Sequence, residues 1–157
     1  MYQKNNLTIQ NFDKNNEYQT KKLKEMVDLL YQKDSSLHTI SAKNIEKTIT
    51  FLEENKNMGK IYLFYEDNQI IGYSILIFYW HNEYGGLLLN IDELFVIQSH
   101  RSKGIGKFFF EYLHQNYNQK IIGYALEVAP DNQKAIDLYT KIGFSMRHNH
   151  FLLKLKS

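Results

Sequence analysis

The stretch from Asn90 to Tyr117 constrains the fold more than any other part of the chain, because it combines a strand, a glycine-containing loop and a helix. Ile91–Ile97 is mostly β-branched, aromatic or aliphatic, which is typical of a strand buried on both faces. The helix that follows has the i, i+3, i+4, i+7, i+8 spacing of a single apolar face, formed by Ile105, Phe108, Phe109, Tyr112 and Leu113.

The loop between strand and helix, Arg101-Ser102-Lys103-Gly104-Ile105-Gly106, has the chemistry of a phosphate site. Glycine lets the backbone approach a ligand, and the first N–H groups of a helix have no intrahelical partner. Together with the helix dipole and the cations Arg101, Lys103 and Lys107, these amides favour an anion. The alternative is a turn that only joins strand to helix.

Two other phosphate loops do not fit. A Walker loop ends in Gly-Lys-Ser/Thr, whereas this chain has Gly106-Lys107-Phe108. A dinucleotide-binding fingerprint needs a small residue where Phe109 stands, because the helix must approach the strand closely.

Two carboxylates, Asp92 and Glu93, interrupt the apolar strand. Burying a carboxylate costs free energy unless it is paired or used. Side chains alternate along a strand, so we expect the two to face opposite sides of the sheet unless a bulge intervenes. One could serve a cleft as a base or as an anchor for an ammonium group; a structural ion pair is the alternative.

Composition limits the classes of function. The chain has 157 residues, 43% hydrophobic and 23% charged, which suits one ordinary globular domain. Cysteine is absent, which excludes an acyl-cysteine mechanism, and the formal charge of +2 is too small to indicate nucleic acid. No apolar run reaches the length of a membrane span and the N-terminus has no signal-peptide core, so we expect a cytoplasmic protein.

The remaining pattern predicts an α/β domain with a mixed sheet in the order β-α-α-β-β-β-α-β-α-β-β. The expected strands are Leu7–Phe12, Lys60–Glu66, Ile70–Trp80, the central strand from Leu87, Tyr124–Val128, Phe144–Met146 and Phe151–Lys156. The other expected helices are Tyr18–Asp34, one that follows an N-cap at Ser41, and Asn132–Ile142, which ends at a C′ glycine, Gly143.

At these residues the chain resembles the GNAT superfamily of N-acetyltransferases. Arg101, Gly104 and Gly106 match its Arg/Gln-x-x-Gly-x-Gly/Ala pyrophosphate loop, which follows a strand ending in apolar-x-Val. A second match begins at Asn132 and runs through Tyr139 to Gly143-Phe144, as Asn-x-x-Ala-x-x-Leu-Tyr-x-x-x-Gly-Phe. The resemblance extends over one domain, residues 7–157, and implies a sheet with splayed central strands.

The resemblance implies acetyl-CoA as co-substrate, with no metal. Its pyrophosphate would bind Arg101–Lys107, and Asn132 would anchor the cofactor near Lys134. The pantetheine arm would meet the backbone of Leu94, Phe95 and Val96. Tyr139 would protonate the departing thiolate, and either Asp92 or Glu93 would be the base or amine anchor, since the segment is similar to that of polyamine acetyltransferases.

The acceptor site is the least defined. Trp80, His81, Glu83 and Tyr84 could form one wall of a pocket, with Tyr31, Asp34 and His38 forming the other. Aromatic rings beside acidic groups would suit a cationic amine, although ordinary core and surface roles explain them equally well. His148 and His150 have no third ligand at metal spacing, so no metal is expected.

The expected function is therefore direct transfer of an acetyl group to a primary amine on a small molecule or peptide. No nucleic acid or membrane partner is expected, and a homodimer is compatible with the family. The first alternative is a non-catalytic acyl-CoA-binding or sensing module on the same fold, and the second is a nucleotide-binding switch.

Overall fold

The structure is a computed structural model that describes residues 2–4, 6–33, 43–149 and 152–156. The chain divides into two compact units, Met1–Glu127 and Val128–Ser157. In the described residues, the first unit contains β1 (Tyr2–Lys4), β2 (Leu7–Asn11), α1 (Glu17–Lys33), α2 (Asn44–Glu54), β3 (Gly59–Glu66), β4 (Gln69–His81), β5 (Gly86–Val96), α3 (Ile105–Tyr117) and β6 (Gly123–Leu126). The second contains α4 (Gln133–Lys141).

The six strands form one sheet in the order β1-β2-β3-β4-β5-β6. Each strand pairs antiparallel with its neighbour except β5 and β6, which are parallel and are connected through α3. The predicted α/β fold with a mixed sheet is confirmed. The short β1 was not predicted.

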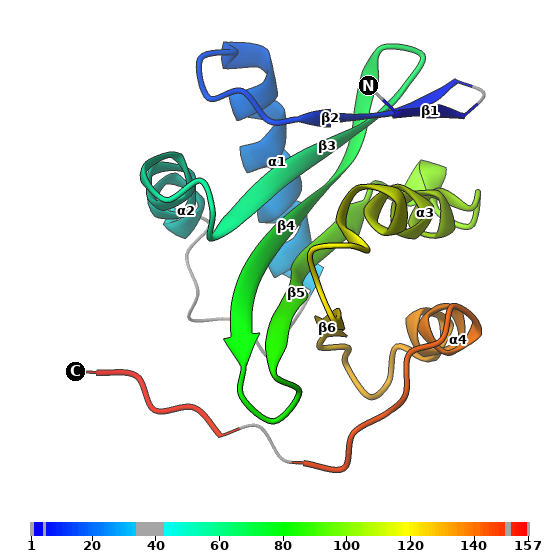
Figure 1. The fold of residues 1–157 in the computed structure, drawn as a ribbon. Helices are drawn as coiled ribbons and strands as arrows, with labels where there is room; N and C mark the ends of the chain where they lie inside the picture. The colour runs from blue at the N-terminus through cyan, green and yellow to red at the C-terminus, as the bar shows by residue number, and fades with distance from the viewer. Residues whose placement is uncertain (1, 5, 34–42, 150–151, 157) are drawn as a thin grey trace. The chain divides into compact units, whose positions relative to one another are not determined.

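Helices cover both faces of this sheet, as Figure 1 shows. On one face α1 and α2 contribute Leu23, Val27, Ile45 and Leu52 to a core cluster that includes Tyr73 of β4 and Phe95 of β5. Apolar residues on α1 and α2 repeat at helical spacing, so each helix buries one side and leaves charged residues in water.

The opposite face packs aromatic rings against α3. Phe109, fully buried, contacts Tyr62 and Phe64 of β3, with ring centroids 6.2 Å and 4.9 Å away. The hydroxyls of Tyr62 and Tyr117 lie 2.5 Å apart, so two buried polar groups satisfy each other. The predicted apolar side of the helix after the glycine loop is confirmed.

The connection between β3 and β4 is a two-residue hairpin turn, because Gln69 already belongs to β4. Asp67 and Asn68 have φ values of 48° and 66°. A two-residue turn with both φ angles positive matches the right-handed twist of the strands that it joins.

The central strands separate after a short stretch of pairing. β6 pairs with β5 only from Leu88 to Ile91, whereas β5 continues to Val96 beside β4. The predicted splaying is confirmed. It leaves the backbone of 92–96 without a strand partner on the β6 side in the described part of the chain.

The predicted closing strands, Phe144–Met146 and Phe151–Lys156, are wrong for the residues that the structure describes, since 144–149 and 152–156 form no strand. Leu152, Leu153 and Leu155 are exposed. A favourable pattern of residues forms a strand only where another strand completes its hydrogen bonds, and these segments have none.

No helix among the described residues combines the length and the apolar character needed to span a bilayer.

Candidate active site

A β-bulge in β5 places Asp92 and Glu93 on the same face of the sheet. Glu93 pairs with Ile75 and Ile91 pairs with Leu76, so Asp92 is the extra residue without a partner on β4. The Asn90 side-chain amide lies 3.5 Å from Asp92 Oδ1, at the limit of a hydrogen bond. The bulge thus cancels the alternation that would send the two carboxylates to opposite faces.

The Glu93 carboxylate is held between two tyrosines. Tyr73 on β4 donates to Oε2 at 2.8 Å, and Tyr31 on α1 donates a short hydrogen bond to Oε1. The Ser74 hydroxyl donates to the Glu93 backbone carbonyl at 2.8 Å. These contacts attach α1 to the central strand through one carboxylate.

Burial has the largest effect on the pKa of the Glu93 carboxyl group. It raises the pKa of Glu93, while the two tyrosine bonds lower it and nearby Asp92 raises it again. Burial, and then the charge of Glu93, raises the pKa of both Tyr31 and Tyr73, so both remain protonated donors at neutral pH.

Asp92 retains contact with solvent, and partial burial of its carboxylate raises its pKa. Among the described residues, no Lys, Arg or His forms an ion pair with Asp92 or Glu93. The structural ion pair weighed as an alternative is therefore not present there. Two carboxylates with no ion-pair partner among the described residues form a place that favours a cation.

The start of α3 presents backbone donors. Its N-cap, Gly104, has a left-handed conformation (φ 80°, ψ 10°), and no side chain caps the helix. A Cβ on Gly104 would meet no atom within 4 Å, so the space beside it is clear. The first backbone bond of the helix runs from Phe108 N–H to the Gly104 carbonyl, so the preceding amides of Ile105, Gly106 and Lys107 have no intrahelical partner.

The cations of this loop have different surroundings. Arg101 donates from Nε to the Val96 carbonyl at 2.8 Å, and its guanidinium lies 5.4 Å from the centre of the Phe95 ring. Lys103 Nζ lies 3.9 Å from Glu66, which also contacts His100 at 3.0 Å. Arg101 therefore fastens the loop to the end of β5, and the backbone amides are the main donors that face a ligand.

The predicted acceptor residues fall into separate groups. Tyr31 lies at Glu93, whereas Trp80 is five residues beyond Ile75 on β4, roughly 16 Å at the rise of a strand. His81 stacks on Tyr84 with ring centroids 4.6 Å apart, and Trp80 is 65% exposed. Asp34, His38, Ser41 and His150 lie outside the described residues.

The sequence did not identify Tyr73, which donates one of the two hydrogen bonds to the Glu93 carboxylate. A tyrosine in a buried strand carries a hydroxyl that needs a partner, and the adjacent carboxylate was a candidate for it. Glu66 was missed as well, because nothing in the sequence places the end of β3 beside the loop after β5.

In the second unit, Asn132 caps α4 by accepting a hydrogen bond from Ala135 N–H at 3.2 Å. At the other end, Gly143 N–H bonds the Thr140 carbonyl and Phe144 N–H bonds the Tyr139 carbonyl. Gly143 has φ 102°, so this is a Schellman motif with the predicted glycine at C′. Its apolar contact is Tyr139 against Phe144, with centroids 5.7 Å apart, and this contact orients the Tyr139 ring.

No group of three or more His, Cys, Asp or Glu suited to a metal ion occurs within the described ranges.

The acetyltransferase (GNAT) family model matches residues 21–144 of the chain. The chain therefore belongs to the GNAT acetyltransferase family.

Solved structures show the same fold. One is an aminoglycoside acetyltransferase from an uncultured soil metagenomic sample, with TM-score 0.73 and 19% identity over 97% of this chain and 98% of that one. Another is a ribosomal-protein-alanine N-acetyltransferase from Brucella melitensis biovar Abortus 2308, with TM-score 0.72 and 14% identity over 95% and 99%. A third is a possible acetyltransferase from Clostridium difficile 630, with TM-score 0.72 and 17% identity over 96% and 99%. No curated protein sequence matches the chain at a significant level.

Asp92→Asn is expected to raise the melting temperature near pH 7 by about 2 °C and to leave it unchanged near pH 4. The folded pKa of Asp92 is raised, so the wild type loses stability as pH rises from the unfolded pKa, about 4, through the folded value. The asparagine variant does not. Calorimetry across pH 3.5–8 measures this, with the exposed Asp28→Asn as control. A gain of equal size at both pH values would contradict the burial of this carboxylate.

Proposed function

We propose that the protein transfers an acetyl group from acetyl-CoA to a primary amine while both substrates are bound. The observation that carries the proposal is the pair Asp92–Glu93, placed together by a bulge and without a basic neighbour among the described residues. A primary amine is cationic at neutral pH, so this face attracts it and can then remove its proton.

Acetyl-CoA fits the C-terminal end of β5 and the loop that follows it. The capless start of α3, with clear space beside Gly104, suits the diphosphate. Lys107, exposed in the first turn, and Ser102 and Lys103 in the loop surround the same amides. In the part of the chain that the structure describes, the backbone of Leu94–Val96 has no strand partner on the β6 side, which suits an amide-rich pantetheine arm. When bound there, acetyl-CoA supplies the activated acyl group, and backbone N–H groups of β5 polarise its carbonyl.

The two carboxylates have different roles in this proposal. Both oxygens of Glu93 already accept hydrogen bonds from tyrosines, so Glu93 is a fixed negative charge that holds the ammonium. Asp92 has a weak contact with Asn90 and keeps its access to solvent. Its raised pKa brings it closer to neutral pH, where a general base is more effective. Asp92 therefore takes the proton as the nitrogen attacks.

Tyr139 is the proposed acid. Burial raises its pKa, so the hydroxyl is protonated at neutral pH and able to donate. An ordinary thiol has a pKa of about 8.5 and a phenol about 10, so transfer between the unperturbed groups costs roughly 2 kcal/mol. Burial of Tyr139 raises the phenol pKa and increases this cost, whereas desolvation of the thiolate raises the thiol pKa and reduces it. The Schellman contact with Phe144 fixes the ring from which the proton leaves.

The decisive test is release of free thiol from acetyl-CoA across a panel of amines, with heat-killed protein as the blank. At least one primary amine is expected to accelerate release above the rate with water alone. Saturable acetyl-CoA binding without release for any amine would instead support the acyl-CoA sensor. Stronger thermal protection by nucleotide than by acetyl-CoA would support the nucleotide switch.

Asp92→Asn is expected to lower kcat/KM about 10²-fold and to remove the acidic limb of the pH–rate profile, because the base is lost. Glu93→Gln should mainly raise KM for the amine and keep that limb. Steady-state kinetics at several pH values separate the two variants. If Glu93→Gln abolished the limb and Asp92→Asn kept it, the assignment of roles would be reversed.

Tyr139→Phe is expected to keep acetyl-CoA affinity and to lower kcat about 10²-fold, since only the acidic proton is lost. Calorimetric binding and turnover are measured on the same preparation. The exposed Tyr18→Phe serves as a matched control. Turnover equal to that of the control variant would remove Tyr139 from the mechanism.

A further inference from the structure

A pocket of about 270 Å³ lies between α2, the end of β2 and the start of β3. It shares no residue with the candidate active site. It lies at the opposite end of β3 from Glu66, which contacts the loop before α3. Its volume is near the lower end of the range for pockets that bind small molecules.

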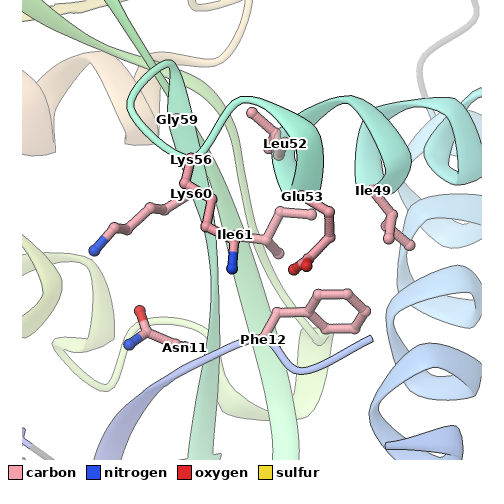
Figure 2. Close-up of a pocket in the computed structure, with 9 residues that line it drawn as sticks. All are labelled: Asn11, Phe12, Ile49, Leu52, Glu53, Lys56, Gly59, Lys60 and Ile61. Carbon is pink, nitrogen blue, oxygen red and sulfur yellow. The ribbon is translucent and has the colours of Figure 1, made fainter. Parts of the chain in front are cut away.

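The inner surface of this pocket is apolar. Ile49 and Leu52 of α2, Ile61 of β3 and Phe12, which directly follows β2, line it (Figure 2). Gly59 makes this arrangement possible, since a Cβ there would lie 2.9 Å from Leu52 Cδ2 and 2.2 Å from the Leu76 carbonyl. The hydrogen bond from Phe12 N–H to the Ile61 carbonyl (3.0 Å) keeps β2 beside β3 at this point.

Two lysines border the apolar surface. Lys56 and Lys60 lie on the side of the pocket away from Ile49 (Figure 2), and both are exposed. Within the described residues the ammonium group of neither lysine makes a hydrogen bond or an ion pair. Asn11 adds a side-chain amide at the same border.

Negative charge at the pocket is smaller than the positive charge. Glu53 also lines it, and the C-terminal end of α2 contributes the partial negative charge of its carbonyls. Glu53 is paired with Lys14, whose Nζ lies 3.7 Å from its carboxylate. The Lys14–Glu53 pair is neutral as a whole. The two positive charges of Lys56 and Lys60 therefore exceed the partial negative charge at the end of α2, about half a unit, by more than one unit.

We propose that this pocket is a second ligand site that takes a small amphipathic anion, an aliphatic carboxylate. Its tail contacts Phe12 and Ile49, and its carboxylate lies between Lys56 and Lys60. Such a ligand differs in charge from the amine and in size from acetyl-CoA. The site is therefore independent of the proposed reaction.

The test uses octanoate and, as a probe of equal chain length and opposite charge, octylammonium. Methyl chemical shifts of Ile49, Leu52 and Ile61 are followed by NMR during titration of the full chain. Octanoate is expected to move these methyls with saturation and octylammonium to bind at least fivefold more weakly.

The double variant Lys56→Gln/Lys60→Gln is expected to weaken octanoate about fivefold, as for two exposed ionic contacts. The control is Lys21→Gln/Lys120→Gln, which removes the same charge from exposed positions elsewhere and should bind as the wild type does. No saturable shift, equal binding of the two probes, or equal weakening in both double variants would each overturn the proposal.

Discussion

The carboxylate of Glu93, held by the hydroxyls of Tyr31 and Tyr73, is the interaction on which the site depends. A buried charge without partners would destabilise the fold, and these two donors satisfy it without a neutralising cation. They also tie α1 to the central strand. The carboxylate therefore has hydrogen-bond partners in the interior, on the face to which the bulge has turned Asp92.

The C-terminal half of β5 carries this arrangement. The strand carries the carboxylates at the bulge, loses β6 as a partner after Ile91, and ends at Val96, whose carbonyl holds Arg101. Arg101 in turn fixes the loop that leads to the capless start of α3. The proposed places for an ammonium group and for a diphosphate thus lie on successive segments of the same unit. The cost is the stability lost by keeping Asp92 and Glu93 partly desolvated.

Local signals predicted most of the elements, because their causes are local. The apolar face of α3 and the C′ glycine at Gly143 each follow from spacing or backbone conformation. The bulge depends on register with β4, so the sequence allowed it without predicting it. The partnership of Tyr73 with Glu93 likewise joins two strands. The predicted closing strands were wrong because the strand propensity of Phe144–Met146 does not indicate whether another strand is available to pair with it. The family follows from the two motifs together, whereas the roles of Asp92, Glu93 and Tyr139 remain proposals.

The most direct test of this account is a pH titration of the Asp92 and Glu93 side-chain carboxyl groups by ¹³C NMR, in the wild type and in Asp92→Asn. Carboxylates that share one desolvated face should both titrate above their ordinary pKa values, and the midpoint of Glu93 should fall when the charge of Asp92 is removed. Ordinary midpoints for both groups, with Glu93 unaffected by the substitution, would show that the two carboxylates do not lie together and would contradict the proposed site.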